Sequence, residues 1–438
     1  MELFSQPLSL TTLLVNVIIC SLYGWLMYTW SQKYPLRKHL FPALLIKIIA
    51  GIGLGLIYRH HYEALGDTFS YFHDAQLIAA QYDQSPIAYL DFITFSVNDY
   101  TEVIHSLQIK NPRGLIFSKL ASVSYLLSEN YWLMSIHFSL FSFLGSWQLA
   151  NRLTQLFKGK QLLVAISFFY FPSFVFWSSG LLKESVLIGS LFLLMAWLLQ
   201  WIYAPKSLKL RGIKIGLGLL FLYLIFKMKY YYLAAFIPCI GLLLIAEWLD
   251  KTWAFPAWKK YMTLFVLLFM LAGLASFVHP NLHADQIITA IVTNNLKMAA
   301  ETENQTALIQ FEALEPNLLS LLQHMPTALW EGLFRPYIWE KGHLFWRFTA
   351  FENTLILLLC FGTIRTLVFS GLSTKPIYQN IIIFSLLYIL VLAVLLSLAA
   401  PNLGNLVRYK TGFMPFLIYL LLHAAFFQKK SITQPNKF

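Results

Sequence analysis

The sequence predicts an all-α protein, a polytopic transmembrane helical bundle. Apolar residues make up 58% of the 438-residue chain and charged residues only 12%, about half of the roughly 25% typical of soluble domains. Apolar runs that are long enough to cross a hydrocarbon core of about 30 Å recur along the whole chain. Such runs are expected to be helices, because a helix satisfies its own backbone hydrogen bonds in lipid.

About eleven apolar runs are expected to span the membrane in a single transmembrane domain, residues 1–438. The runs are about 9–30, 40–58, 131–150, 161–179, 185–203, 213–227, 230–248, 261–278, 351–370, 378–400 and 411–427. Two polar intervals, 59–130 and 279–350, are expected to be large outer loops that carry interfacial helices. Gly114–Leu127 is short and contains Lys119 and serines, so it is expected to lie at the interface and not to span.

The distribution of charge predicts the orientation. If Gly114–Leu127 does not span, most basic connections, including Arg152–Lys160, fall on one side, which is then cytoplasmic. Nearly all acidic residues fall on the opposite side, with Glu247 and Asp250 as exceptions. The N-terminus is therefore expected outside and the C-terminus inside.

Several function classes are disfavoured. The sequence has no Walker loop and no dinucleotide-type glycine fingerprint, which argues against nucleotide hydrolysis. Cys20, Cys239 and Cys360 lie within expected spans without metal-type spacing, so no zinc site is expected. The net charge of +12 is interpreted through its distribution across the membrane, and no nucleic-acid partner is expected.

The first outer loop contains Gly66-Asp67-Thr68 followed by Tyr71, His73 and Asp74. On a helix, Asp67, Tyr71 and Asp74 share one face. An acid just beyond the end of a span suits a general base. The alternative is that Asp67 is the N-cap of the following helix.

Two further stretches place cations at expected outer turns. Lys183 and Glu184 follow a Trp-Ser-Ser-Gly turn almost at membrane depth, which favours a shaped pocket. The alternative is a snorkelling lysine beside a helix-starting glutamate. Lys227 and Lys229 precede three tyrosines, so they are candidates either for binding a lipid phosphate or for anchoring at the interface.

The last two candidate stretches contain arginine. Arg335 offers a planar fork for phosphate oxygens, and Trp339 could stack on a sugar. Arg335, Glu340 and Glu331 could instead form a purely structural charge cluster. Residues 401–410 form the final outer turn, where cations violate the charge bias of the rest of the chain and an anionic ligand would explain them.

These motifs together resemble the GT-C superfamily of polytopic glycosyltransferases, which includes the protein mannosyltransferases and the aminoarabinose and related lipid-A transferases. The blocks around Arg335-Pro336 and Asn402–Tyr409 are also similar to bacterial exopolysaccharide-synthesis membrane proteins, including polymerases. The resemblance implies transfer of a sugar from a polyprenyl-phosphate-type carrier to a glycan, lipid or protein acceptor. It implies that this transfer takes place at the outer face of the bacterial cytoplasmic (inner) membrane.

The leading hypothesis is an inverting glycosyl transfer with Asp67 and Glu184 as catalytic residues. Asp67 would deprotonate the acceptor, which is the role that the resemblance implies, and Glu184 or Asp74 would orient substrate or cations. No cofactor or metal ligand is assigned, although a divalent cation is compatible with the acidic residues. A polymerase or ligase of the same pathway and a lipid-linked saccharide transporter or flippase are the alternatives. The predicted substrate-binding residues are Tyr71, His73, Asp74, Lys183, Lys227, Lys229, Arg335, Trp339, Glu340, Asn402, Arg408 and Lys410.

Overall fold

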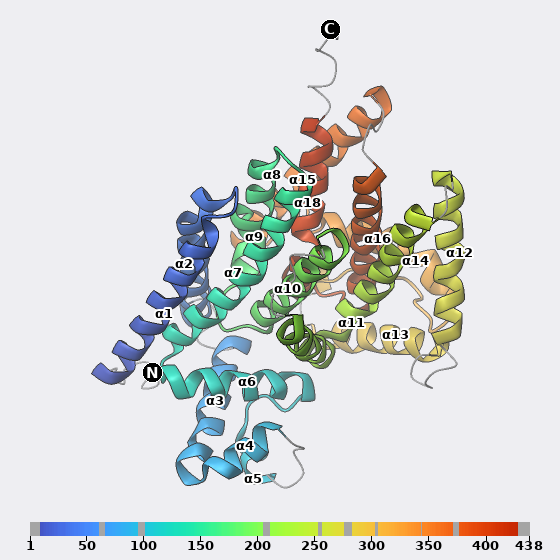
Figure 1. Ribbon diagram of the computed structural model, residues 1–438. Helices are drawn as coiled ribbons and strands as arrows, with labels where there is room; N and C mark the ends of the chain where they lie inside the picture. Colours follow the sequence, from blue (N-terminus) through green and yellow to red (C-terminus); the bar gives the residue numbers. More distant parts are fainter. Residues whose placement is uncertain are drawn as a thin grey trace. The chain divides into compact units, whose positions relative to one another are not determined.

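The structure of the protein is a computed structural model. The structure describes residues 9–60, 66–94, 101–204, 211–252, 256–275, 283–302, 305–342, 344–370 and 376–427. Within these ranges every regular element is helical, and the only strand-like pairing is an isolated bridge between Leu308 and Asn402. The prediction of an all-α fold is confirmed (Figure 1). Parts of the expected loops and spans, namely 61–65, 95–100, 276–282, 303–304 and 343, lie outside the described residues.

Six helical segments in the described part of the chain are long and apolar enough to cross a membrane, which indicates a multi-pass membrane protein. Only 11% of the apolar window in the first of them is buried inside the protein, as expected for a helix that faces lipid. The six are Leu10–Ser31, Arg37–His60, Lys183–Tyr203, Gly212–Thr252, Phe345–Thr366 and Gln379–Ala399.

The chain forms two compact units, Met1–Tyr230 and Tyr231–Phe438, which we call unit 1 and unit 2. The boundary falls inside the long helix α11 (Arg211–Thr252). Unit 1 also contains α1 (Leu10–Ser31), α2 (Leu40–His60), α3 (Asp67–Gln84), α4 (Pro86–Thr94), α5 (Thr101–Ser106), α6 (Pro112–Ser128), α7 (Tyr131–Leu156), α8 (Gln161–Ala165), α9 (Pro172–Trp177) and α10 (Lys183–Tyr203). Unit 2 contains α12 (Ala257–Ala275), α13 (Ala284–Ala300), α14 (Leu318–Phe334), α15 (Leu344–Ser370), α16 (Pro376–Ala399), α17 (Leu403–Tyr409) and α18 (Met414–Phe427).

Small residues bring the long helices of unit 1 close together. A Cβ on Gly51 of α2 would lie 2.3 Å from the Ser139 hydroxyl of α7. A Cβ on Gly145 of α7 would lie 2.5 Å from the carbonyl oxygen of Gly189 of α10. Such close approach is typical of helix packing within membranes, where dispersion and hydrogen bonds hold helices together.

Two breaks account for part of the difference between the eleven apolar runs of the sequence and the six candidate spans of the described residues. The run 161–179 forms α8, a π-helical turn (Ile166–Tyr170) and α9, because a new helix begins at Pro172. The runs 213–227 and 230–248 form one element, α11, whose backbone leaves the helical region at Lys229 (φ −150°, ψ 72°). The total of about eleven spans stays a prediction.

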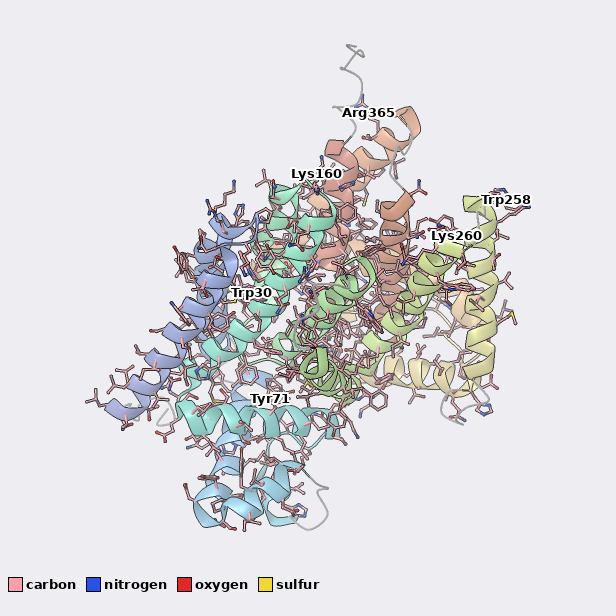
Figure 2. The ribbon with its side chains drawn as sticks, in the orientation of Figure 1. Trp30, Tyr71, Lys160, Trp258, Lys260 and Arg365 are labelled. Atoms are coloured by element: carbon pink, nitrogen blue, oxygen red, sulfur yellow. The ribbon has the colours of Figure 1, made fainter. Side chains whose placement is uncertain are left out.

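The helices of the first expected loop lie beyond one end of the long helices of unit 1. Helix α6 runs crosswise to α1, α2 and α7 in Figure 1, and α3, α4 and α5 lie on its far side. Figure 2 places Tyr71 of α3 beside α6, whereas Lys160 lies at the opposite end of unit 1. This arrangement suits the expectation that α6 does not span, and it separates the first loop from the basic connection Arg152–Lys160.

Unit 2 combines helices from the apolar runs with helices from the second polar interval. Helix α14 packs on α15 and α16, and α13 packs on α14 and α16. Residues Trp258 and Lys260 lie near one end of α12, whereas α13 crosses beneath its other end (Figures 1 and 2). Both α13 and α14 belong to the second polar interval, 279–350, which therefore carries helices as expected.

Candidate functional site

Helix α3 begins with the predicted acid. Gly66 is the N-cap, with φ +114°, and Asp67 is the first helical residue. A Cβ at Gly66 would also lie 2.9 Å from a ring carbon of Tyr58, so glycine suits this position for both backbone and space. The alternative in which Asp67 is the N-cap is therefore wrong. Asp67 lies instead in the first turn of α3, where the helix dipole favours a carboxylate.

One turn further along α3 from Asp67, the Tyr71 ring contacts the predicted cation, Lys183. Its ring is 1% exposed and meets the ring of Phe117 in α6 edge-on, with centroids 4.6 Å apart. The Lys183 ammonium, at the start of α10, lies 5.5 Å from the centroid of the Tyr71 ring. Residues from three helices, α3, α6 and α10, therefore meet at Tyr71.

Glu184 and Lys229 form a buried ion pair. The Lys229 ammonium donates a 2.7 Å hydrogen bond to the Glu184 carboxylate, and the two side chains are 4% and 0% exposed. Burial of two charges is tolerated when each neutralises the other. The pair connects the first turn of α10 to the break in α11, so it joins two residues that the sequence assigned to separate turns.

The Ser178–Gly180 turn before α10 is fixed by α2 and α7. The N–H of Gly180 donates to the Ser139 hydroxyl at 2.9 Å, and the backbone of Gly180 has φ +72°. The ammonium of Lys47 donates to the Ser178 hydroxyl. These contacts set the position at which α10 begins, and hence the positions of Lys183 and Glu184. The shaped pocket expected at Lys183 and Glu184 stays a prediction, and the anchors of this turn in α2 and α7 were not foreseen.

Asp74 has protein partners for its carboxylate. The side chain is fully buried and accepts hydrogen bonds from the N–H groups of Gln108 and Ile109, at 2.8 and 3.1 Å, and from the Ser118 hydroxyl at 3.3 Å. The neighbouring His73 ring lies 3.7 Å from it. Asp74 therefore fastens the segment before α6 to α3. The substrate roles predicted for Asp74 and His73 stay predictions and gain no support from these contacts.

In unit 2, Arg335 is surrounded by protein acceptors. Its guanidinium donates to the carboxylates of Glu340 (2.6 Å) and Glu331 (3.1 Å). It also donates to the carbonyl oxygens of Leu308 (2.7 Å) and Thr306 (3.2 Å). All three guanidinium nitrogens are thus occupied. These contacts favour the structural charge cluster over the phosphate fork for both Arg335 and Glu340.

Lys410 and Asn402 also have structural partners. The Lys410 ammonium is buried and donates to the carbonyl oxygens of Leu333 and Arg335, at 3.3 and 2.8 Å, where α14 ends. Burial lowers the pKa of Lys410 to about 7. The Asn402 side chain caps α17 and donates to the Thr302 hydroxyl at 2.9 Å. Both residues hold unit 2 together at the predicted final turn.

The other predicted residues differ widely in burial. Trp339 is 74% exposed and stacks on Tyr337 with centroids 4.9 Å apart, so it is available to a sugar or to the membrane interface. Arg408 is only 8% exposed. Lys227 is exposed on α11, with its ammonium 5.8 Å from the ring centroid of Tyr223.

Sequence reasoning missed Glu352, a carboxylate 4% exposed in α15. The sequence offered one indication of it: Glu352 lies at the start of the apolar run 351–370, and charged residues are uncommon at membrane depth. The neighbouring Asn353 donates to the carbonyl oxygen of Pro336 at 3.2 Å, which attaches α15 to the segment after Arg335.

The predicted residues thus form two groups, one in each unit. Unit 1 brings together Tyr71, Lys183, Glu184 and Lys229, with Asp67 one turn from Tyr71. Unit 2 brings together Arg335, Glu340 and Lys410. The expectation that residues of both groups bind the substrate stays a prediction.

No protein-family model, curated protein or solved structure matched the chain in comparisons with known proteins. Across the described ranges, no three or more His, Cys, Asp or Glu side chains are grouped so that they could hold a metal ion. We take the unit 1 group as the candidate site because it combines an acid at a helix start, Asp67, with a cation, Lys183, whose ammonium faces the ring of Tyr71.

Proposed function

We propose that the protein is a membrane glycosyltransferase. It transfers a sugar from a polyprenyl-phosphate-type lipid carrier to an acceptor hydroxyl at the outer face of the bacterial cytoplasmic membrane. The observation that carries the proposal is the contact between Lys183 and Tyr71, one helical turn from Asp67. It supports a site in which a carboxylate and a cation act on the same substrate. The resemblance of the Gly66-Asp67-Thr68 and Trp-Ser-Ser-Gly motifs to the GT-C superfamily supplies the reaction class.

In this mechanism Asp67 takes the proton from the acceptor hydroxyl. The acceptor oxygen forms a bond to the anomeric carbon while the bond from that carbon to the carrier phosphate breaks, so the configuration inverts. The bonding electron pair leaves with the phosphate oxygen, where the Lys183 ammonium stabilises the added negative charge. The lipid-linked donor and the acceptor are the only reactants, and the reaction needs no oxidant, reductant or nucleotide.

Tyr71 and Glu184 have supporting roles in the proposal. The Tyr71 ring, packed against Phe117, gives the Lys183 ammonium a fixed aromatic surface. Glu184 was predicted to be catalytic, but its carboxylate binds Lys229, so we assign it the positioning of the first turn of α10. Asp67 is then the proposed base, with Lys183 as the proposed phosphate contact.

The test is sugar transfer by the purified full chain in proteoliposomes. The donor is a synthetic polyprenyl-phosphate-linked sugar, and the acceptors are supplied as a mixture of glycans and lipids. Wild type should release the carrier phosphate and extend an acceptor, whereas the Lys183→Gln variant should lose about 100-fold or more in rate. Lys183→Arg should retain part of the rate. Absence of transfer by wild type from this donor to any of the acceptors would overturn the proposal.

The same assay separates the alternatives. Processive products containing many repeat units would identify a polymerase or ligase. Movement of intact lipid-linked saccharide across the bilayer without release of carrier phosphate would identify a transporter. Both results would replace the single-sugar transferase.

A further inference from the structure

The candidate site in unit 1 belongs to a closed chain of contacts that includes a residue not yet considered, Arg113 of α6. The central carbon of its guanidinium lies 4.8 Å from the ring centroid of Tyr230. Tyr230 directly follows Lys229, which forms the 2.7 Å ion pair with Glu184. The same first turn of α10 that supplies Glu184 also supplies Lys183.

The chain of contacts then returns to α6. The Lys183 ammonium faces Tyr71 at 5.5 Å, and Tyr71 packs on Phe117 with centroids 4.6 Å apart. Phe117 lies one helical turn after Arg113 on α6, so the two side chains project from neighbouring positions of one face. These contacts therefore connect Arg113 to Lys183 within unit 1. We call the group that they form the cationic rim: Tyr71, Arg113, Lys183, Lys229 and Tyr230.

Arg113 and Arg335 differ in the hydrogen bonds of their guanidinium groups. Arg113 is exposed, and its guanidinium has no hydrogen bond or ion pair with the part of the chain that the structure describes. Stacking on an aromatic face uses the flat surface of the guanidinium and leaves its N–H edge available. That edge can donate hydrogen bonds to two oxygens of a phosphate. The N–H groups of Arg335 donate instead to acceptors within the protein.

The charge near the rim favours an anion. Lys110 and Lys227 are exposed close to Arg113 and Lys229 in the chain, and they add to the positive charge of Lys183. Among the nearby acids, Glu184 is neutralised by Lys229 and the Asp74 carboxylate has three protein donors, so Asp67, the proposed base, is the remaining one of the three. Helices α3, α6 and α10 also begin near this rim, at Asp67, Pro112 and Lys183, and their N-terminal dipoles add to the positive potential.

We propose that Arg113 binds the phosphate of the substrate, holding the phosphate or diphosphate headgroup of a lipid carrier together with Lys183. The identity of the ligand as a lipid phosphate rests on the proposed function. The presence of an anion site at Arg113 rests on the contacts of the cationic rim. Tyr230 is the platform that orients the guanidinium, so Tyr230→Phe should preserve binding and Tyr230→Leu should weaken it.

Binding can be measured without any transfer reaction. The purified full chain in phosphatidylcholine nanodiscs is titrated with geranylgeranyl phosphate, with geranylgeraniol as the probe that lacks phosphate. Arg113→Gln should raise the dissociation constant about tenfold, the scale of a lost pair of charge-assisted hydrogen bonds. Arg113→Lys should recover only part of the affinity, because an ammonium has no planar fork. The matched control is Arg347→Gln, which changes an exposed arginine of α15 in unit 2.

The outcomes separate this inference from the proposed function. If wild type binds the lipid phosphate and Arg113→Gln binds it equally well, the role of Arg113 is overturned while the transferase proposal stands. If wild type binds geranylgeranyl phosphate no better than geranylgeraniol, the proposed donor class fails as well. Competition by inorganic phosphate at the same concentration as the lipid probe would overturn the assignment to a lipid headgroup. Weak competition by inorganic phosphate would support it.

Discussion

The ammonium of Lys229 lies 2.7 Å from the carboxylate of Glu184 and belongs to the residue at which the backbone of α11 leaves the helical conformation. This buried ion pair joins two residues that are 45 positions apart in the chain, one at the start of α10 and one at the break in α11. The pair therefore fixes where α10 begins relative to the bend in α11. Lys183, next in the chain to Glu184, is positioned by the same interaction.

Loss of one partner of this pair should be costly. Glu184→Gln and Lys229→Met each leave an uncompensated buried charge, which typically costs about 3–5 kcal/mol. The double variant Glu184→Leu/Lys229→Met removes both charges and should recover most of the lost stability. Thermal unfolding in detergent, followed by tryptophan fluorescence, measures the three variants. If the double variant loses as much stability as the two single variants lose in total, the two residues are not coupled.

Asp67 and Asp74 should respond differently to the same substitution. Asp67→Asn should reduce sugar transfer by about 100-fold or more, the usual contribution of a general base, with a small effect on stability because Asp67 is only partly buried. Asp74→Asn should instead lower the unfolding temperature, because the carboxylate holds two backbone N–H groups and a hydroxyl. Full transfer activity in Asp67→Asn would remove Asp67 from the mechanism.

Two glycines of α2 provide a matched test of close packing. Alanine at Gly51 would place its Cβ 2.3 Å from the Ser139 hydroxyl and 3.0 Å from the backbone nitrogen of Gly180. Gly51→Ala should therefore destabilise the protein by about 1–3 kcal/mol. Gly53 has nothing within 4 Å of its Cβ position, so Gly53→Ala should be neutral or stabilising by about 0.5–1 kcal/mol. Similar unfolding temperatures for the two variants would contradict the close approach of α2 and α7.

The sequence predicted the class of the fold and several of its helices. Apolar runs indicated membrane helices, and the polar Lys-Met-Lys interruption indicated the break that the structure places at Lys229. The periodicity of the first loop placed Asp67, Tyr71 and Asp74 on one helix, which is α3. Such features depend on neighbouring residues, so they can be read from the sequence.

The partners of charged side chains were harder to predict, because they depend on packing between distant segments. Arg335 has a fork suited to phosphate, but the protein supplies its acceptors from Glu331, Glu340 and the 306–308 segment. Arg113 carries the same fork and was not singled out, because its environment is created by Tyr230 from another helix. The residue type is the same in both cases, and only the fold distinguishes them.

The contrast between these two arginines predicts opposite phenotypes. Arg335→Gln should lower the unfolding temperature, because it leaves the partly buried carboxylates of Glu331 and Glu340 without their cation. It should leave the affinity for geranylgeranyl phosphate within about twofold of wild type when the protein is kept below that temperature. An affinity loss as large as the one expected for Arg113→Gln would return Arg335 to the substrate site.

Lys410 should make stability depend on pH. Burial lowers its pKa to about 7 in the folded protein, whereas an unfolded lysine has a pKa of about 10.4. Between these values the unfolded chain retains a proton that the folded chain has released, so the free energy of unfolding should rise as pH increases from about 7 to 10. Below about pH 7 both states are protonated and the cost of the buried charge is fully present.

The Lys410→Met variant isolates this contribution. It should flatten the rise in unfolding temperature between pH 7 and 10, because the titrating group is gone, although the carbonyl oxygens of Leu333 and Arg335 lose a donor. Lys297→Met is the control, since the Lys297 side chain is 72% exposed and should not change the slope. An unchanged slope in Lys410→Met would mean that the ammonium stays protonated in the folded protein, stabilised by the carbonyl oxygens at the end of α14.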